Sequence, residues 1–464
     1  MASDKYGLAM GGSEAAIAHF NRALSHLVRF QPEIVTESEA AIQADPGCVM
    51  ARIFRAYVGA MSSEWPDTRG AAEFVKGAAP GNDRERAHLA AVSAWVGGDM
   101  HAAGRILDGI LTDHPRDLLA LAVGHQVDFL TGDARNLRGR VERVRPRFSS
   151  ADQDASFLDG MWAFGLEECG DYARSEEAGL RSVSANPNDV WGIHAVVHTY
   201  EMQGRVASGI RYLETRRKDW MEGTFLNVHN AWHLAIYLLE CEEHARSLAI
   251  YDEVIHHEKS AGVAMEMLDG SGLLWRLFLD GIDTGGRFGA LADAWTAKDP
   301  LPWYVFNDLH AIMALVGAGR QAEAEAVVAR LEAFARGENG SAANRVMVTG
   351  AGLAAARSLA AFGRGDDREV IEHLAPVRHH LSIFGGSHAQ RDAYQRTLLA
   401  SALRAGERAL AALLLEERIE ARPSSLWAWG GRVRLHQRSG QAQEAQAAEA
   451  TRASHLASHR AALA

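Results

Sequence analysis

The chain has 464 residues, 47% of them hydrophobic, and a net charge of −11 at neutral pH. That is enough apolar material for a large core or for an extended helical array. The acidic balance argues against a nucleic-acid partner, because such proteins carry a basic surface. No apolar run approaches the roughly 20 residues that span a bilayer, so we also expect no membrane partner.

The cysteines and the first residues of the chain bear on its compartment. The chain has three cysteines, Cys48, Cys169 and Cys241, and none of them forms a C-x-x-C pair. An odd number of isolated cysteines favours free thiols in a reducing compartment. The opening sequence MASDKYGLAMGG lacks a basic segment followed by an apolar one, as a secretory signal would have. We therefore expect a cytoplasmic protein.

Helix is expected throughout the chain, which has eleven prolines and many Ala, Leu, Arg and Glu residues. In chain order, the predicted first helices of successive pairs are 83–97, 117–131, 154–169, 189–203 and 227–241. A glycine-rich segment at about 258–300 is expected to be less regular. Later predicted pairs are 303–318 with 320–336, 386–405 with 407–421, and 425–439 with 442–460, the last being a C-terminal capping pair at about 425–460.

Turn glycines recur at a nearly constant interval along the first half of the chain. Gly98, Gly132, Gly170 and Gly204 are 34, 38 and 34 residues apart, and the next turn falls near Cys241–Glu242. A helix–turn–helix unit of about 34 residues is typical of tetratricopeptide repeats. The sequence therefore predicts an all-α, tetratricopeptide-like superhelix of degenerate repeats curling around a central groove. No linker divides it, so residues 1–464 are expected to form a single domain.

Two His-x3-His spacings fall on neighbouring first helices. His194 and His198 are followed by Glu201 in one helix, and His229 and His233 lie in the next. Residues four apart share one face of a helix, so each set forms a single stripe. Adjacent repeats place such stripes about 10 Å apart, side by side. We therefore expect four imidazoles and a carboxylate to face a common groove.

These motifs belong to a larger set that resembles the tetratricopeptide repeat protein 38 family. The matching segments, in the same order over residues 14 to 420, are HAVVHTYEMQGR (194–205), NVHNAWHLAIYLLE (227–240), FNDLHAIMAL (306–315) and GGSHAQRDAYQ (385–395). The resemblance implies a repeat superhelix whose first helices line the concave surface. It supplies the positions of the motifs more than it supplies an activity.

Further polar side chains are expected at the same central cavity because they lie on later first helices or near their starts. The predicted catalytic residues are His194, His198, Glu201, His229, His233 and Asp308. The predicted ligand-binding residues are Asn230, Asp269, Asn307, His310, Gln390, Arg391 and Asp392.

Three interpretations of these residues remain open. In the first, His194, His198, His229 and His233 bind a divalent metal such as zinc. In the second, the pocket is metal-free: the histidines do acid–base work, and Arg391 holds an anionic group. In the third, the groups are structural; Ser387 and Gln390 then form a capping box, and Arg391 and Asp392 form salt bridges between repeats.

The favoured function is a soluble protein with a His/Glu/Asp/Arg-lined pocket that binds a small polar or anionic ligand. If that ligand is converted, hydrolase- or lyase-type chemistry fits acid–base or metal-assisted groups. The alternative is a non-enzymatic scaffold with a protein partner, the usual role of this repeat class. A homodimer through an exposed terminal helix pair is compatible with the sequence.

Overall fold

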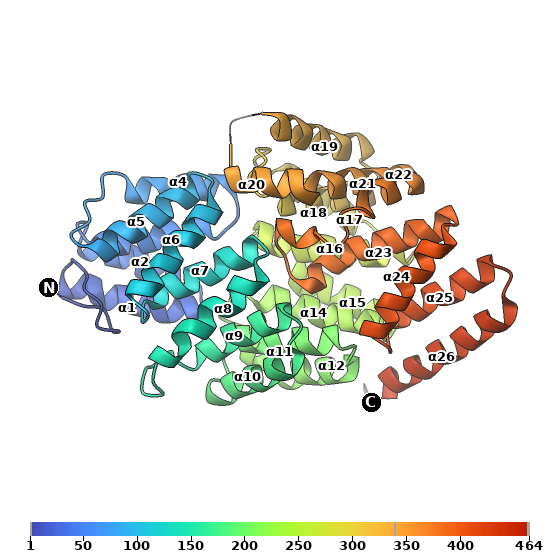
Figure 1. Ribbon diagram of the computed structural model, residues 1–464, viewed down its shortest axis with the longest axis horizontal. Coiled ribbons are helices and arrows are strands. Elements are labelled where there is room, and N and C mark those ends of the chain that lie inside the picture. The colour runs from blue at the N-terminus through green and yellow to red at the C-terminus, as the bar shows by residue number, and fades with distance from the viewer. Residues whose placement is uncertain (1, 338–339, 462–464) are drawn as a thin grey trace.

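The computed structural model describes residues 2–337 and 340–461 and is helical along its length (Figure 1). Apart from an isolated bridge between Ser3 and Ala9, these described residues contain no β-structure. The all-α prediction is therefore confirmed. Residues 1, 338–339 and 462–464 of the predicted single domain lie outside the described part.

The helices follow one another with short turns between them. Those of the N-terminal half are α1 (Glu14–Val28), α2 (Glu33–Ala44), α3 (Val49–Ala60), α4 (Trp65–Val75), α5 (Asp83–Val96), α6 (Met100–Asp113), α7 (Leu118–Leu130), α8 (Ala134–Val144), η1 (Arg145–Arg147), α9 (Phe157–Glu168), α10 (Tyr172–Ala185), α11 (Val190–Met202), α12 (Val206–Thr215) and α13 (Arg217–Trp220). Those of the C-terminal half are α14 (Asn227–Leu239), α15 (His244–Ile250), η2 (Tyr251–Ile255), α16 (Ala264–Leu279), α17 (Arg287–Thr296), α18 (Val305–Gly317), α19 (Gln321–Arg336), α20 (Ala342–Met347), η3 (Val348–Gly352), α21 (Leu353–Arg364), α22 (Asp367–Leu374), η4 (Leu381–Phe384), α23 (His388–Ala405), α24 (Arg408–Ala421), α25 (Leu426–Arg438) and α26 (Ala442–Ala461).

The turns between paired helices depend on left-handed backbone. The four glycines of the predicted turns have φ between 67° and 92°, a range that side chains with a Cβ rarely adopt. Glu242 takes the same conformation at the fifth predicted turn, with φ 57°. At Gly132 space adds a second requirement, since a Cβ would lie 1.7 Å from the carbonyl oxygen of Ser382. Aspartate N-caps then start several second helices; Asp99, for example, accepts from the Ala102 amide at 2.8 Å.

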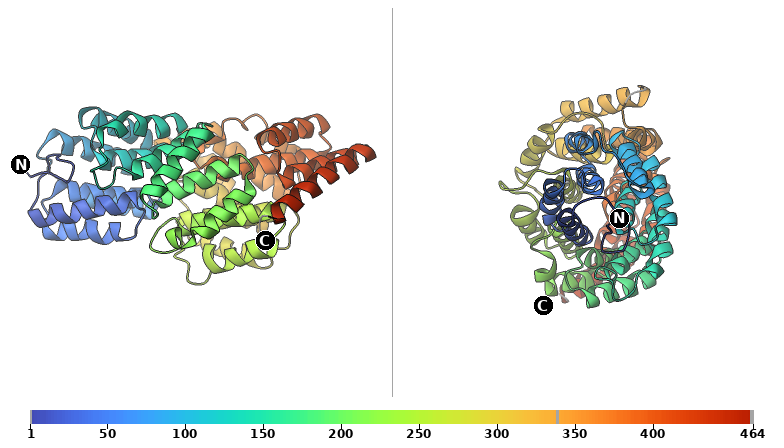
Figure 2. Two further views of the ribbon diagram at one scale, coloured as in Figure 1. Left: turned by 90° about the horizontal axis from the view of Figure 1, so that it is seen from below. Right: turned by 90° about the vertical axis from the view of Figure 1, so that its left-hand side faces the viewer.

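Helices of successive pairs pack against one another, so that α9 contacts α11, α14 contacts α16, and α16 contacts α18. Viewed end-on, the helices surround the long axis of the molecule (Figure 2). Their apolar faces form one continuous core that includes Trp95, Trp232 and Trp275. The four histidine-bearing turns of α11 and α14 lie inside this packed region.

The turns of the N-terminal half dock onto the C-terminal half. Ser341 donates through its hydroxyl to the Gly98 carbonyl at 2.9 Å, and Ser424 donates to the Gly204 carbonyl at 2.8 Å. Tyr304 donates to the Leu130 carbonyl, next to the Gly132 turn, at 3.1 Å. Contacts of α23 with both α11 and α16 lie between these points. These contacts join the two halves of the chain.

The glycine-rich segment at about 258–300 is more regular than expected, because it contains the ordinary helices α16 and α17. Gly270 and Gly272 lie inside α16, which allows Leu291 and Arg276, respectively, to approach its backbone. The capping pair expected at about 425–460 corresponds to α25 and α26.

One helical run, Ala342–Arg364, is long and apolar enough to cross a membrane. In its most apolar window 61% of the residues are buried, and its α21 part contacts α18, α19 and α22. Core helices of folded domains have this composition and this burial.

Candidate functional site

Four histidines converge between α11 and α14. His194 and His198 come from successive turns of α11, and His229 and His233 come from successive turns of α14. Each histidine contributes one ring nitrogen to a group of four nitrogens that all lie within 4.8 Å of one another. The ring centroids of His194 and His198 are 4.3 Å apart, and those of His198 and His233 are 4.5 Å apart. We call this group the tetrahistidine cluster.

Carboxylates contact three of the four rings from outside the cluster. His229 Nδ1 lies 2.9 Å from both oxygens of Asp269, on α16, and His233 Nδ1 lies 2.9 Å from Glu201 Oε2. His198 Nδ1 lies 3.6 Å from Glu167 Oε2. A carboxylate accepts hydrogen bonds, so we assign the proton of His229 and His233 to Nδ1. This tautomer leaves the Nε2 lone pair of each ring on the side facing the cluster.

Two of the inner nitrogens are hydrogen-bonded to each other, and two have vacant lone pairs. His194 Nε2 donates to His229 Nε2 at 3.0 Å, because the proton of His229 is on Nδ1. Nε2 of His198 and of His233 is buried and has no hydrogen-bond partner in the described chain. Tetrahedral nitrogen ligands lie about 3.3 Å from one another, since each is about 2.0–2.1 Å from zinc. His194 and His229 are already close to this separation, and one nitrogen of each of the four rings lies within 4.8 Å of the others, so an ion that contacts all four would draw the rings closer together.

Burial keeps three of the four imidazoles neutral. Burial, followed by the neighbouring histidines, holds the pKa values of His194 and His198 well below the ordinary value, and the pKa of His233 is lowered in the same way. Neutral imidazole is the form that binds a metal. His229 differs from the other three because 15% of its side-chain surface is exposed. Solvent therefore reaches the cluster at His229.

A second polar group lies beside the cluster and escaped the sequence analysis. Glu167 and Glu168 end α9, and His388 begins α23; His388 Nδ1 lies 3.6 Å from Glu167 Oε1 and 3.7 Å from Glu168 Oε1. Glu168 is engaged by Arg391 at 2.9 Å and by the His388 amide at 2.7 Å. Both Glu167 oxygens are buried without a hydrogen-bond partner among the described residues, and burial raises the pKa of Glu167 to about 7.

A signal for Glu167 was present in the sequence. Glu167 precedes Glu201 by 34 residues, one repeat, and each ends the first helix of its pair close to the turn glycine. Equivalent positions of neighbouring repeats lie side by side. Aligning the repeats by their turn glycines would have placed both carboxylates next to the same histidines.

Three predicted ligand-binding residues on α23 have their partners within the protein. Gln390 forms a capping box with Ser387, as the structural interpretation proposed. Arg391 is paired with Glu168, and Asp392 accepts from Arg396 and Arg418, both at 2.8 Å. These side chains are therefore committed to stabilising helix contacts, which corrects the prediction of a free ligand clamp.

The other predicted residues are divided among separate places. Asp269 joins the tetrahistidine cluster, whereas His310 donates through Nδ1 to the Phe306 carbonyl at 2.8 Å. Asn230 is fully buried, and neither its side-chain oxygen nor its nitrogen has a partner in the described chain. Asn307 and Asp308 line a different cavity, of about 220 Å³. The structure thus places the groups that were predicted to share one central cavity at several separate positions.

A small cavity of about 30 Å³ adjoins the cluster through Glu201. Its other charged lining residues are Glu240, Arg276, Asp392, Arg396 and Arg422. Such a volume holds one or two water molecules. Glu201 thus connects His233 to a small cavity lined by charged residues.

A search of known protein families finds no family model that matches this chain.

Proposed function

We propose that this chain is a metalloprotein related to the tetratricopeptide repeat protein 38 family, with a divalent transition metal such as zinc bound by His194, His198, His229 and His233. The observation that carries the proposal is the convergence of four imidazoles, three of them buried, with carboxylates on the outer nitrogens of His229 and His233. In this proposal the helical pairs form a tetratricopeptide-like superhelix. The superhelix positions α11 and α14 side by side.

The energetics of the cluster support a bound ion. A buried nitrogen acceptor without a partner costs about 1–3 kcal/mol, and Nε2 of His198 and of His233 are both in this position in the described chain. A cation that accepts these lone pairs removes that cost. The same cation would be bound by His194 Nε2 and His229 Nε2, whose close approach then reflects binding to one ion.

The outer carboxylates support the same assignment. Asp269 and Glu201 fix the tautomer and the ring orientation of His229 and His233, as outer-sphere carboxylates do in histidine metal sites. Their negative charges also offset a dication held by four neutral rings. Four imidazoles without a thiolate suit zinc and neighbouring first-row metals better than magnesium or calcium, which prefer oxygen ligands.

The proposed activity is conversion of a small polar or anionic molecule at the exposed side of the cluster. A metal in this position supplies Lewis-acid catalysis and a water of lowered pKa, which is the chemistry of hydrolases and lyases. Substrate approaches along His229, whose side chain is accessible. Exchange of His229 for water leaves His194, His198 and His233, the three-histidine set of an open catalytic site.

The test is metal analysis of the purified chain before and after reconstitution with zinc. We expect one equivalent per chain, with affinity at least 100-fold weaker in His198→Ala and in His233→Ala. His310→Ala is the matched control, since His310 is equally buried but bonds to a carbonyl. Circular dichroism identifies any variant that fails to fold. A folded wild-type protein that takes up no zinc, cobalt, manganese or iron overturns the proposal.

A further inference from the structure

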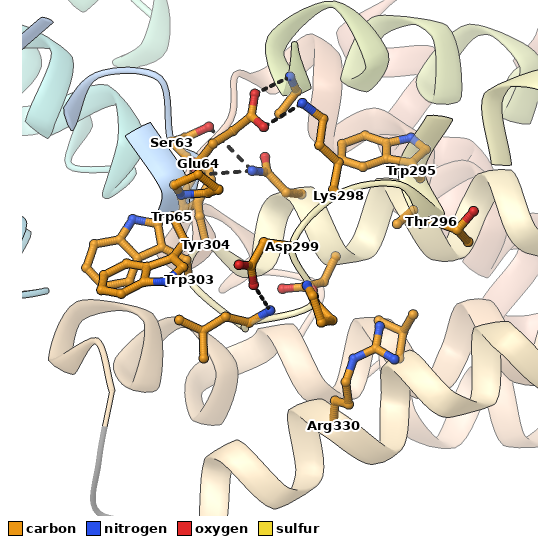
Figure 3. Close-up of a pocket in the computed structure, with 18 of the residues that line it drawn as sticks. Ser63, Glu64, Trp65, Trp295, Thr296, Lys298, Asp299, Trp303, Tyr304 and Arg330 are labelled. Carbon is orange, nitrogen blue, oxygen red and sulfur yellow. Dashed lines mark hydrogen bonds and ion pairs between the residues drawn. The ribbon is translucent and has the colours of Figure 1, made fainter. Parts of the chain in front are cut away.

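A second cavity lies away from the tetrahistidine cluster, between segments distant in sequence. It has a volume of about 220 Å³ and is walled by the start of α4, the start of α16, the loop from α17 to α18, and the adjoining faces of α18 and α19 (Figure 3). Tertiary folding thus brings Trp65 next to Trp303, more than 200 residues along the chain. This volume suits a small ligand, below the usual range for drug-sized molecules.

Aromatic rings form one side of this cavity. The ring centroids of Trp65 and Trp303 are 4.7 Å apart with an interplanar angle of 44°, and both rings are drawn together in Figure 3. Trp295 and Tyr304 also line the cavity. Their polar atoms are occupied elsewhere: Trp295 donates to Ser271 at 2.9 Å, and Tyr304 donates to the Leu130 carbonyl. These residues therefore offer ring surface to a ligand.

Asn307 and Asp308, at the start of α18, contribute acceptors to the lining: no described residue donates to Asn307 Oδ1, and the Asp308 carboxylate is approached by its own backbone amide. Asn307 donates through Nδ2 to the Ser63 carbonyl at 3.1 Å, which fixes the amide orientation and identifies Oδ1 as the free atom. Oδ1 is buried and has no partner within the described residues. Asp308 forms no salt bridge with any other described residue, and burial raises its pKa to about 7, against an opposing effect of Arg330. The lining thus contains unused acceptors.

The basic residues of the lining do not satisfy these acceptors. Lys298 is held by Glu64 at 2.6 Å, and the other Glu64 oxygen accepts from the Ala264 amide at 2.9 Å. Arg330 is exposed on α19. In total the lining carries four carboxylate residues and two basic ones, so its charge balance is negative. A cation is therefore favoured over an anion.

We propose that this cavity binds a small protonated amine. The ammonium N–H groups donate to the Asp308 carboxylate and to Asn307 Oδ1, and the carbon chain packs on Trp65 and Trp303. Indole faces attract a nearby cation, adding to the charge–charge attraction. An ammonium that carries N–H donors is required, since both acceptors need a hydrogen-bond donor. The site stands independently of the metal proposed at the tetrahistidine cluster.

The test is isothermal titration of the full chain with four probes: n-butylamine, phenethylamine, tetramethylammonium and butyrate. We expect saturable binding of at least one primary amine, with tetramethylammonium and butyrate at least tenfold weaker. Tryptophan fluorescence should change with the same affinity. Absence of saturable amine binding, or equal binding of butyrate, overturns the proposal.

Two isosteric substitutions locate the site. Asp308→Asn keeps the shape of the side chain and is expected to weaken amine binding at least tenfold. Asp293→Asn is the matched control, because Asp293 lies on the neighbouring helix α17, pairs with Arg320 and does not line the cavity. If Asp308→Asn fails to fold, Trp65→Leu provides the second test with the same expected loss. Unchanged affinity in a folded Asp308→Asn or Trp65→Leu variant rules out this cavity as the amine site.

Discussion

Removal of the carboxylate behind His233 gives the most specific test of how the tetrahistidine cluster works. Glu201 Oε2 lies 2.9 Å from His233 Nδ1, and His233 is fully buried. In Glu201→Ala the outer nitrogen loses its charged partner, and the ring loses both its fixed tautomer and its orientation. In Glu201→Gln a neutral acceptor remains, so the geometry survives and only the charge is lost.

The size of the effect follows from the kind of contact that is removed. Loss of an outer-sphere carboxylate costs about 10–100-fold in metal affinity, which corresponds to about 1.4–2.8 kcal/mol. We expect Glu201→Gln near the lower limit and Glu201→Ala near the upper one. Glu201 is also close to Arg276 and Arg422, which attract its charge from the far side. Their influence makes the full 100-fold effect an upper estimate.

The assay is competition for zinc with a chromophoric chelator at pH 7.5. Glu176→Gln is the control, because Glu176 pairs with Arg205 on the surface and touches no histidine of the cluster. Its zinc affinity should equal that of the wild type. If folded Glu201→Ala binds zinc within twofold of the wild type, the carboxylate does not act through His233 and the reasoning is refuted.

Three further predictions concern stability. Burial lowers the pKa values of His194, His198 and His233, so below about pH 6.5 the unfolded metal-free chain takes up protons at these residues while the folded chain does not. The free energy of unfolding should therefore fall by about 1.4 kcal/mol per pH unit for each of these histidines. Urea titrations that show no loss of stability between about pH 6.5 and 5.5 would contradict this. Ser387→Ala removes the capping box of α23 and should cost about 1 kcal/mol, seen as a lower urea midpoint at unchanged slope, whereas a midpoint equal to that of the wild type would argue against the cap. Arg391→Ala removes the guanidinium that pairs with buried Glu168 and leaves it only the contacts with His388, so it should cost about 3 kcal/mol, the lower limit for a broken buried pair. A loss below about 1 kcal/mol would restore the interpretation of Arg391 as a ligand-binding residue.

The helices and turns could be predicted because local chemistry determines them. The predicted first helices at 83–97, 117–131 and 189–203 agree with α5, α7 and α11 to within one residue at each end. Left-handed turns require glycine in most cases, so Gly98 and Gly204 were visible in the sequence. The fifth turn was found by its interval, although Glu242 occupies it.

The contacts between the two halves could not be predicted in the same way. Nothing local to Gly98 or Gly132 indicates that Ser341 and Ser382 will pack against them. Those contacts join residues more than 240 positions apart, which short sequence patterns do not encode. Such patterns therefore could not decide between ligand contacts and salt bridges for Arg391 and Asp392, which form internal salt bridges.

The histidines illustrate the same division between local and long-range information. The spacing of four residues ensured that His194 and His198 share a face, and adjacent repeats brought His229 and His233 opposite them. Asp269 was among the predicted residues, but its contact with His229 comes from the next helical pair, in the segment that was expected to be irregular. Glu167 was missed although its repeat position matches that of Glu201.

Anomalous diffraction at the zinc absorption edge, from crystals of the zinc-reconstituted chain, tests the central claim most directly. The account predicts one strong peak between α11 and α14, about 2.0–2.1 Å from a ring nitrogen of at least three of the four histidines. Below the edge the peak should vanish. Fully ordered imidazoles with no anomalous peak among them would contradict the claim, and the cluster would then be a buried network of neutral histidines.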